Sequence, residues 1–355
     1  MTGRILFLYF YIFMRYFSFQ WHITDECDQR CKHCYIFSGS NVHIPQSMNR
    51  ENIYKVFNNC IDFCKTFDRE PYFYITGGDP ILHKNFWELL EVFKSHGIFF
   101  SILGNPFHIN DEICKKLKFL GCEKYQLSID GMKSTHDFFR KPGSFDTTLS
   151  KIKCINNAEI YSVIMSTVSS INIKEIPEVI DTVVKNGADV FSFARYCPTE
   201  TGKTIGITPA EYKKFLSECD KKFREYESKG CKTYFDRKDH LWTLYNYENG
   251  YFKIPEDSVP GVIYAGCNCG NAHLTILPSG DVYACRRVKG SIVGNALNNK
   301  LADIWLNEME KYREYTKFEK CSKCELISYC RGCPAVAKGT YGNFYASDPQ
   351  CWKEF

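Results

Sequence analysis

The sequence lacks the features typical of membrane proteins, nucleic-acid-binding proteins and disordered chains. Its 45 basic and 41 acidic residues leave a formal net charge of only +4, which is too even a balance for a protein held mainly by phosphates. No low-complexity tract and no internal repeat occurs. The apolar run Ile5–Met14 has ten residues, far fewer than the ~20 that a membrane helix requires. We therefore expect a globular protein that acts on neither a membrane nor a nucleic acid.

The N-terminus also lacks a convincing secretion signal. It contains no small-residue cleavage site, and the chain runs directly into a strand-like stretch, RYFSFQWHIT. We expect residues 1–15 to be an extension, with Met14 as an alternative start of translation. A chain of 355 residues buries enough core to fold without disulfides. The expected location is therefore the cytoplasm, where cysteines bind metals or take part in redox chemistry.

Cysteine is the residue present in excess, with 19 copies. Three fall in CDQRCKHC, as Cys27, Cys31 and Cys34, and eight lie between Cys267 and Cys351. The others form no tight cluster and are expected to be ordinary core or surface residues: Cys60, Cys64, Cys114, Cys122, Cys154, Cys197, Cys219 and Cys231. The two clusters indicate metal sites near both ends of the chain.

Between the clusters, β-rich runs alternate with amphipathic, helix-like stretches. One run precedes Cys27, and the others span residues 71–76, 97–103, 123–130, 160–168 and 188–196. This alternation predicts an α/β fold with a parallel sheet covered by helices, and six units suit an open, partial (β/α)6 barrel. CDQRCKHC follows the first strand and TGGDP the second, so both lie at the carboxyl ends of strands, where active sites gather.

Changes in composition and pattern along the sequence predict four parts. They are the extension (1–15), the partial barrel (16–196), a helical connector (197–263) and a small cysteine-rich α+β domain (264–355). In the connector, Thr208 and Pro209 predict the start of an amphipathic helix. In the last part, AHLTILPSGDVYACRR predicts a β-hairpin.

Three cysteines within eight residues cannot fill a tetrahedral zinc site alone. They can hold three irons of a [4Fe–4S] cube and leave the fourth iron open, and an open coordination position usually marks chemistry. The alternative is a structural zinc site completed by His22, His33 or His43.

The spacing C-x3-C-x2-C after a first strand resembles the signature of the radical S-adenosylmethionine (SAM) enzymes. The resemblance implies that Cys27, Cys31 and Cys34 hold a [4Fe–4S] cluster whose open iron chelates SAM. SAM is then cleaved to methionine and a 5′-deoxyadenosyl radical, which abstracts hydrogen from a substrate.

Further segments carry the same resemblance. Thr76-Gly77-Gly78-Asp79-Pro80 resembles the family's GGEP motif, with Asp in place of the commoner Glu, and LSIDG (127–131) resembles its ribose-contacting segment. The SAM-binding residues implied are His33, Gly77, Gly78, Asp79, Ser128 and Arg140. Taken alone, the two glycines would be an ordinary turn and Arg140 a surface residue. His33 either packs beside the adenine or points to solvent.

The C-terminal cysteines resemble the SPASM extension, a twitch-type domain with two auxiliary [4Fe–4S] clusters. The resemblance assigns Cys267, Cys269, Cys285 and Cys333 to auxiliary cluster I. It assigns Cys321, Cys324, Cys330 and Cys351 to auxiliary cluster II. Two residues separate Cys330 and Cys333, where the family usually has three. If only one cysteine of the CNC pair is a ligand, auxiliary cluster I keeps one iron without a protein ligand. A pair of structural zinc sites is the alternative for this region.

The resemblance implies an enzyme that modifies a peptide or protein. Our leading hypothesis is a maturase that installs a thioether or carbon–carbon crosslink in a ribosomally made peptide. The runner-up is oxidation of a protein Cys or Ser side chain, as in anaerobic sulfatase maturases. Those enzymes have an Asp after the cysteine equivalent to Cys285, where this chain has Arg286 and Arg287. These arginines either contact an acidic leader peptide or are surface charge.

A non-catalytic iron–sulfur electron carrier is the third hypothesis, and it would have no use for the SAM-binding motifs. No residue stands out as a catalytic base. The expected partners are the substrate and a reducing protein such as flavodoxin or ferredoxin. Because little chain precedes Cys27, we expect a leader-bearing substrate to be recruited either by a separate leader-binding protein or by the barrel mouth and residues 197–263.

Overall fold

The computed structural model describes residues 15–37, 44–198, 206–288 and 290–354. The run Ile5–Met14, both candidate start residues and His43 lie outside these ranges. In the barrel part, the strands are β1 (Tyr16–Thr24), β2 (Glu70–Gly77), β3 (Phe100–Leu103), β4 (Cys122–Ser128), β5 (Tyr161–Val168) and β6 (Val190–Arg195). Later strands are β7 (Tyr234–Asp236), β8 (His273–Ile276), β9 (Asp281–Tyr283) and β10 (Ile292–Asn295).

Helices separate the strands of the barrel part, as the alternating pattern predicted. They are α2 (Arg50–Thr66), α3 (Phe86–Ser95), α4 (Asp111–Phe119), α5 (Lys133–Phe139), α6 (Ser144–Asn157) and α7 (Ile176–Lys185). The later helices are α8 (Pro209–Ser228), α9 (Leu241–Glu248), α10 (Leu301–Asp303), which continues into a π-helical turn, and α11 (Pro334–Tyr341). In the described part of the chain, no helix is long and apolar enough to cross a membrane.

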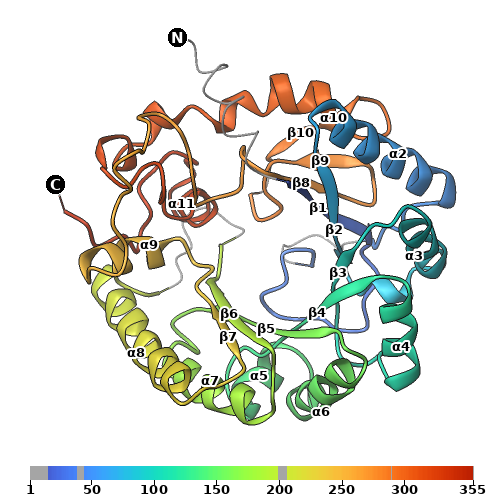
Figure 1. Ribbon diagram of the computed structural model, residues 1–355, viewed down its shortest axis with the longest axis horizontal. Coiled ribbons are helices and arrows are strands. Elements are labelled where there is room, and N and C mark those ends of the chain that lie inside the picture. Colours follow the sequence, from blue (N-terminus) through green and yellow to red (C-terminus); the bar gives the residue numbers. More distant parts are fainter. Residues whose placement is uncertain (1–14, 38–43, 199–205, 289, 355) are drawn as a thin grey trace.

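All ten described strands belong to one curved sheet with the order β10-β9-β8-β1-β2-β3-β4-β5-β6-β7. Neighbouring strands from β8 through to β7 are parallel, so the six predicted strands do form an open, partial barrel. Helices α2 to α8 lie around the outside of the sheet, and the C-terminal segments, orange and red, lie between its two ends (Figure 1).

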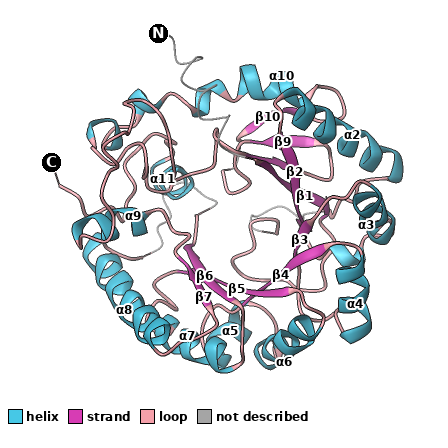
Figure 2. Cartoon of the chain, viewed as in Figure 1, coloured by secondary structure: helices cyan, strands magenta, loops and turns pink. Residues whose placement is uncertain are grey.

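Alternation along β1 shows why the sheet has a helix-facing side and an inner side. Phe17 and Phe19 are buried, and the ring of Phe17 lies 4.4 Å from that of Phe63 in α2. Because successive side chains of a strand point to opposite faces, Ser18 and His22 face the inside of the barrel. Figure 2 shows the same arrangement, with magenta strands inside a ring of cyan helices.

Two strand pairings extend the barrel beyond the six predicted units. β7 lies in the segment expected to be a helical connector, and it pairs in parallel with β6. β8 is the first strand of the predicted hairpin and pairs antiparallel with β9, but it also pairs in parallel with β1. The cysteine-rich part is therefore joined directly to the edge of the barrel sheet. In the connector, α8 begins at Pro209 with Thr208 as its cap, as predicted, and Thr208 also forms a capping box with Glu211.

Arg195, the last residue of β6, ties the barrel to the C-terminal segment. Its guanidinium donates two hydrogen bonds to Asp239, two to Asp348 and one to Gln350, over 2.6–3.2 Å. Asp348 also accepts hydrogen bonds from the backbone N–H groups of Cys333 and Gln350. This buried network fixes the loops that carry the C-terminal cysteines.

Candidate active site

The three cysteines of CDQRCKHC lie in the loop that follows β1, and all are partly buried. The backbone N–H of Gln29 donates to Cys27 Sγ over 3.4 Å, and Cys31 Sγ donates to the side-chain oxygen of Gln29 over 3.3 Å. Burial raises the pKa of Cys27 to about 11. The loop is held against the end of α5 by a hydrogen bond from Lys32 N to Phe139 O.

The spacing of the thiols bears on the kind of metal site. Within the described residues, only Asp28, Asp79 and His108 form a group of three potential ligands whose atoms lie within 4.8 Å of one another. Thiolates bound to one tetrahedral zinc at about 2.3 Å would lie about 3.8 Å apart, so no three described thiols have zinc spacing. An iron–sulfur cube, whose irons are themselves separated, holds its cysteines further apart. Thiols spaced more widely than in a zinc site are compatible with a cluster.

Gly77 and Gly78 bring the turn after β2 against the segment that leads to Cys27. A Cβ at Gly77 would lie 1.9 Å from the carbonyl oxygen of Thr24, and one at Gly78 would lie 2.0 Å from that of Glu26. Gly77 also has a φ of +136°, which side chains rarely allow. The N–H groups of Gly78 and Asp79 donate to those same carbonyls. Close backbone approach explains both glycines.

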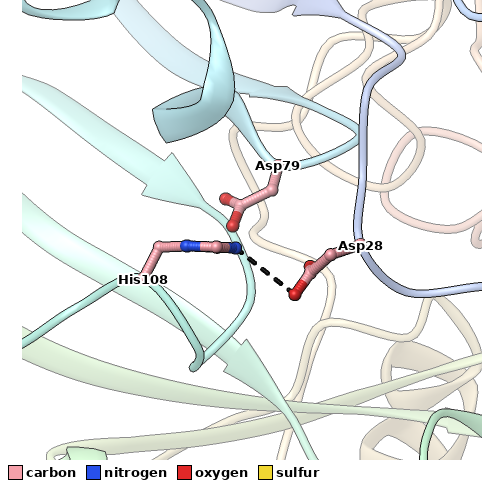
Figure 3. Close-up of side chains that lie close together, drawn as sticks. All are labelled: Asp28, Asp79 and His108. Atoms are coloured by element: carbon pink, nitrogen blue, oxygen red, sulfur yellow. Dashed lines mark ion pairs between the residues drawn. The ribbon is translucent and has the colours of Figure 1, made fainter.

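Asp79 presents a buried carboxylate next to the cysteine loop (Figure 3). No described side chain donates a hydrogen bond to either carboxylate oxygen, although the backbone N–H groups of Asn105 and Ile81 lie nearby. Burial, followed by the charge of Asp28, raises its pKa to about 7. Since a buried carboxylate without a counter-charge is costly, the site fits a cationic ligand group such as the ammonium of SAM.

His108 and Asn105 also lie beside the cysteine loop. His108 Nε2 lies 3.3 Å from Asp28 Oδ2 (Figure 3). Asn105 Nδ2 donates to Asp28 Oδ1 over 2.7 Å and lies 3.9 Å from Cys27 Sγ. Both follow β3, whose exit loop carries no motif, so sequence reasoning missed them.

Arg140 is held by a residue that sequence reasoning also missed. Its Nε donates to Asp130 Oδ2 over 2.6 Å, and its Nη1 lies 3.9 Å from Cys31 Sγ. Asp130 is fully buried and also accepts a hydrogen bond from Thr167 N. The signal was present in LSIDG, in which we predicted Ser128 as the ligand contact. Ser128 itself is half-buried at the end of β4, opposite Met165.

His33 points inward and not to solvent. Its Nε2 lies 3.4 Å from Asp130 Oδ2, and its ring meets Phe139 edge-on at 5.2 Å. Burial lowers its pKa, and Asp130 acts in the opposite direction. His33 and Arg140 thus share one buried carboxylate beside the cysteine loop.

Several of the C-terminal cysteines face one another. Cys267 lies near Cys285 and Cys333, and Cys321 lies near Cys324 and Cys351. The assignment of the eight cysteines to two clusters stays a prediction. Cys197, which we expected to be an ordinary core or surface residue, is buried in a small cluster with Val288, Cys333 and Val336.

The two arginines after Cys285 are half-buried. Arg287 faces the thiols of Cys197, Cys267, Cys285 and Cys333. The guanidinium of Arg286 lies 4.8 Å from the centre of the Tyr35 ring, and its Nε is buried without a hydrogen bond in the described structure. Tyr35 follows Cys34 directly, so the loop of the N-terminal triad meets the loop of Cys285 here.

Basic side chains gather on this inner side of the barrel. We call His22, Lys238, His273, Arg286 and Arg287 the basic group. Burial, followed by the charges of Lys238 and Arg287, lowers the pKa of His273 to about 4. For His22, burial acts first and Arg286 second. Neither ring nitrogen of His22 has a hydrogen-bond partner in the described part.

Comparison with known protein families identifies two parts of the chain. Residues 21–183 match the Radical SAM superfamily, and residues 267–334 match SPASM, an iron-sulfur cluster-binding domain.

Individual relatives span nearly the whole chain. An AdoMet-dependent heme synthase of Methanosarcina barkeri is 25% identical over 93% of this chain and 95% of its own length. Mycofactocin maturase MftC of Mycolicibacterium smegmatis is 26% identical over 93% of this chain and 81% of its own. The structure of Streptococcus suis SuiB bound to the precursor peptide SuiA shares the fold, with a TM-score of 0.74 at 18% identity over 98% of this chain and 78% of that one. The chain belongs to the radical SAM superfamily and is an enzyme with a C-terminal SPASM domain, as its cysteine motifs predicted.

Proposed function

We propose that this enzyme is a peptide maturase that forms an oxidative crosslink, a thioether or a carbon–carbon bond, in a ribosomally made peptide. The observation that carries the proposal is the meeting of the two cysteine loops, where Arg286 beside Cys285 lies over Tyr35 beside Cys34. A substrate placed there would be close both to the site of hydrogen abstraction and to an electron acceptor. The printed names of MftC as a maturase and of SuiB with its precursor peptide agree with a peptide substrate.

The residues of the SAM site divide the work as follows. Cys27, Cys31 and Cys34 would hold the cluster that binds SAM, and with SAM bound this site supplies a 5′-deoxyadenosyl radical. Asp79 would pair with the ammonium group of SAM. Arg140 would pair with its carboxylate, since a guanidinium held by Asp130 is positioned for a charge-assisted contact.

The remaining proposed contacts to SAM involve no charged side chain pair. Gly77 and Gly78 would let the backbone approach the ligand, Ser128 would contact the ribose, and His33 would pack beside the adenine.

Crosslinking removes two hydrogens from the substrate. One leaves as a hydrogen atom to the radical, and the other leaves as a proton, so one electron remains and needs an acceptor. We assign this acceptor to auxiliary cluster I, on Cys267, Cys269, Cys285 and Cys333. Auxiliary cluster II would be held by Cys321, Cys324, Cys330 and Cys351. Anaerobically reconstituted protein should therefore contain three [4Fe–4S] clusters' worth of iron, and one cluster's worth would contradict the assignment.

The test of the reaction is anaerobic co-expression with a candidate small, cysteine-rich precursor peptide, together with a reductase and flavodoxin or ferredoxin. We expect the intact mass of the peptide to fall by two hydrogens per modified site. The Cys31→Ala variant should give neither this loss nor 5′-deoxyadenosine. Cys324→Ala should still cleave some SAM while forming no product. An unchanged peptide mass with 5′-deoxyadenosine still forming would exclude that peptide as the substrate.

The same assay, with a separate leader-binding protein added, tests whether the substrate needs that protein to bind to the enzyme.

The runner-up reaction, oxidation of a protein Cys or Ser side chain, requires a base. Arg286 occupies the position after Cys285, and Asp236, a neighbour of Tyr74 and Lys238, is one carboxylate that could serve. Loss of product in Asp236→Asn, with a sulfatase-derived peptide as substrate, would favour the runner-up.

The basic group supports a second candidate, oxidation of a tetrapyrrole that bears carboxylates. Relatives named AdoMet-dependent heme synthase and Fe-coproporphyrin III synthase match 93% and 94% of the chain at 25% and 23% identity. Fe-coproporphyrin III is the probe: a saturable change in its absorption spectrum, weakened at least tenfold in Lys238→Met but unchanged in the exposed control Lys133→Met, would favour this candidate. A spectral change that does not saturate would count against this candidate.

A further inference from the structure

His22 presents a buried imidazole to the inner side of the barrel. It lies near the end of β1, opposite Thr76 of β2, and its side chain is fully buried. Neither Nδ1 nor Nε2 has a hydrogen-bond partner in the described part of the chain. Leaving a buried donor or acceptor unpaired is costly, and the few such groups in native proteins call for an explanation. The proposed reaction so far gives His22 no role.

Arg286 brings a second unpartnered donor to the same place. Its guanidinium carbon lies 4.8 Å from the centre of the Tyr35 ring and 5.6 Å from that of Tyr283. The ring centre of His22 lies 6.1 Å from the same Tyr35 ring. Among the described residues, Arg286 forms no ion pair, and its buried Nε has no hydrogen-bond partner. Two unsatisfied side chains therefore lie beside one tyrosine ring.

Strand pairing explains how Arg286 comes to face His22. Tyr283 of β9 pairs with Thr275 of β8, and Thr275 pairs with Gln20 of β1. Directly paired residues of neighbouring strands lie on the same face of a sheet, so Tyr283 is on the inner side with Gln20. His22 follows Gln20 by two residues and shares that face. The pairings thus bring the loop after β9, which carries Arg286, to the side that His22 faces.

The chemistry of these two side chains selects an anion as their missing partner. Burial, followed by the charge of Arg286, lowers the pKa of His22, so its imidazole is neutral and offers one N–H group. The guanidinium adds charged N–H donors in a geometry that matches a carboxylate. The other group that acts on His22 is His273, which is also basic. A carboxylate would accept from both donors and neutralise Arg286.

We propose that His22 and Arg286 bind a carboxylate of the substrate and so hold the residue to be modified between the two cysteine loops. The inference deepens the proposed function and rests on it, because it takes the substrate to bind where Arg286 lies over Tyr35. Tyr35 follows Cys34, and Arg286 follows Cys285. Both are half-buried and so remain in part accessible. An acidic side chain or the C-terminus of a peptide supplies such a carboxylate, and so does a tetrapyrrole.

The test measures binding without turnover, by anaerobic equilibrium dialysis of reconstituted holoenzyme with saturating SAM. Two pools of dansylated peptide amides are degenerate over uncharged residues at every position but one, which is Glu in the first pool and Gln in the second. A third pool has Gln and a free C-terminal carboxylate, and Fe-coproporphyrin III is the fourth probe. His22→Leu and Arg286→Met are compared with Lys133→Met, whose exposed ion pair with Asp146 lies on the outer helices.

We expect at least one carboxylate-bearing probe to bind saturably, and which one does so identifies the source of the carboxylate. Its affinity should fall at least tenfold in His22→Leu and in Arg286→Met, recover in part in Arg286→Lys, and stay unchanged in Lys133→Met. The amide pool with Gln should bind all variants equally. Iron content should be unchanged, and the melting temperature of His22→Leu should not fall, because the imidazole makes no hydrogen bond in the free protein.

Other results overturn the inference. Equal binding of the Glu and Gln pools, with no saturable binding of the other two probes, would show that no carboxylate is recognised. Full affinity in Arg286→Met would place the carboxylate elsewhere, and a lower melting temperature or iron content in His22→Leu would make His22 a structural residue. The proposed function fails by a different readout: a bound carboxylate probe, with no loss of two hydrogens from any peptide, would refute the crosslink and leave the carboxylate site standing.

Discussion

Replacing Arg195 with Met should destabilise the protein strongly. The side chain of Arg195 is fully buried, and those of Asp239 and Asp348 are 4% and 1% exposed. Arg195→Met keeps the aliphatic stem but removes five hydrogen bonds and leaves two buried carboxylates without their cation. Removing one partner of a buried ion pair costs about 3–5 kcal/mol. With an unfolding entropy of about 2.1 cal/mol/K per residue over 355 residues, each kcal/mol lowers the melting temperature by about 1.3 °C, so it should fall by roughly 5 °C.

The assay is a thermal melt of apo protein, with Lys133→Met as the control. Lys133 forms an ion pair with Asp146 in which both side chains are more than half exposed, and such pairs contribute about 0–1 kcal/mol. Because Asp348 also holds Cys333 N, Arg195→Met should lose auxiliary iron as well. Equal melting temperatures for the two variants would refute the conclusion that this network joins the barrel to the C-terminal segment.

Three further changes test the SAM site. In apo protein, the folded state holds the proton of Asp79 to higher pH than the unfolded state does, because the pKa of Asp79 is raised to about 7. The free energy of unfolding should therefore fall as pH rises from about 4 to about 7. Asp79→Asn should flatten this slope in thermal melts and weaken SAM binding in equilibrium dialysis. Gly78→Ala would place a methyl group 2.0 Å from Glu26 O, so it should destabilise the protein by about 1–3 kcal/mol and lower iron loading at the triad. Asp130→Asn should free Arg140 and weaken SAM binding at least tenfold, with iron content unchanged; full affinity would contradict its positioning role.

Local patterns were enough to predict most of the fold. The six strands of the barrel and the helices between them follow from runs whose spacing is set by the chain itself. The start of α8 follows from a cap, Thr208, whose partners lie within one turn. In the same way, the turn at Gly77 and Gly78 was recognisable because its residue types are dictated by close backbone approach.

The features that were missed depend on residues far apart in the sequence. β7 has only three residues, and it becomes a strand because the edge of β6 is available to it. β8 was predicted as half of a hairpin, but its second partner, β1, precedes it by some 250 residues. Asp130 is unremarkable within LSIDG until Arg140 and His33 are folded against it.

These long-range contacts converge on one place. β8 pairs with β1 immediately before the cysteine triad, and Arg195 holds the loop of Cys333 from the opposite edge of the barrel. Arg286 then lies over Tyr35, between the two proposed kinds of cluster. Hydrogen abstraction and electron uptake would therefore occur on the same inner side of the sheet. A substrate would then not have to move between the two steps. This matters for an oxidation, because the radical left on the substrate must lose its electron before it reacts elsewhere.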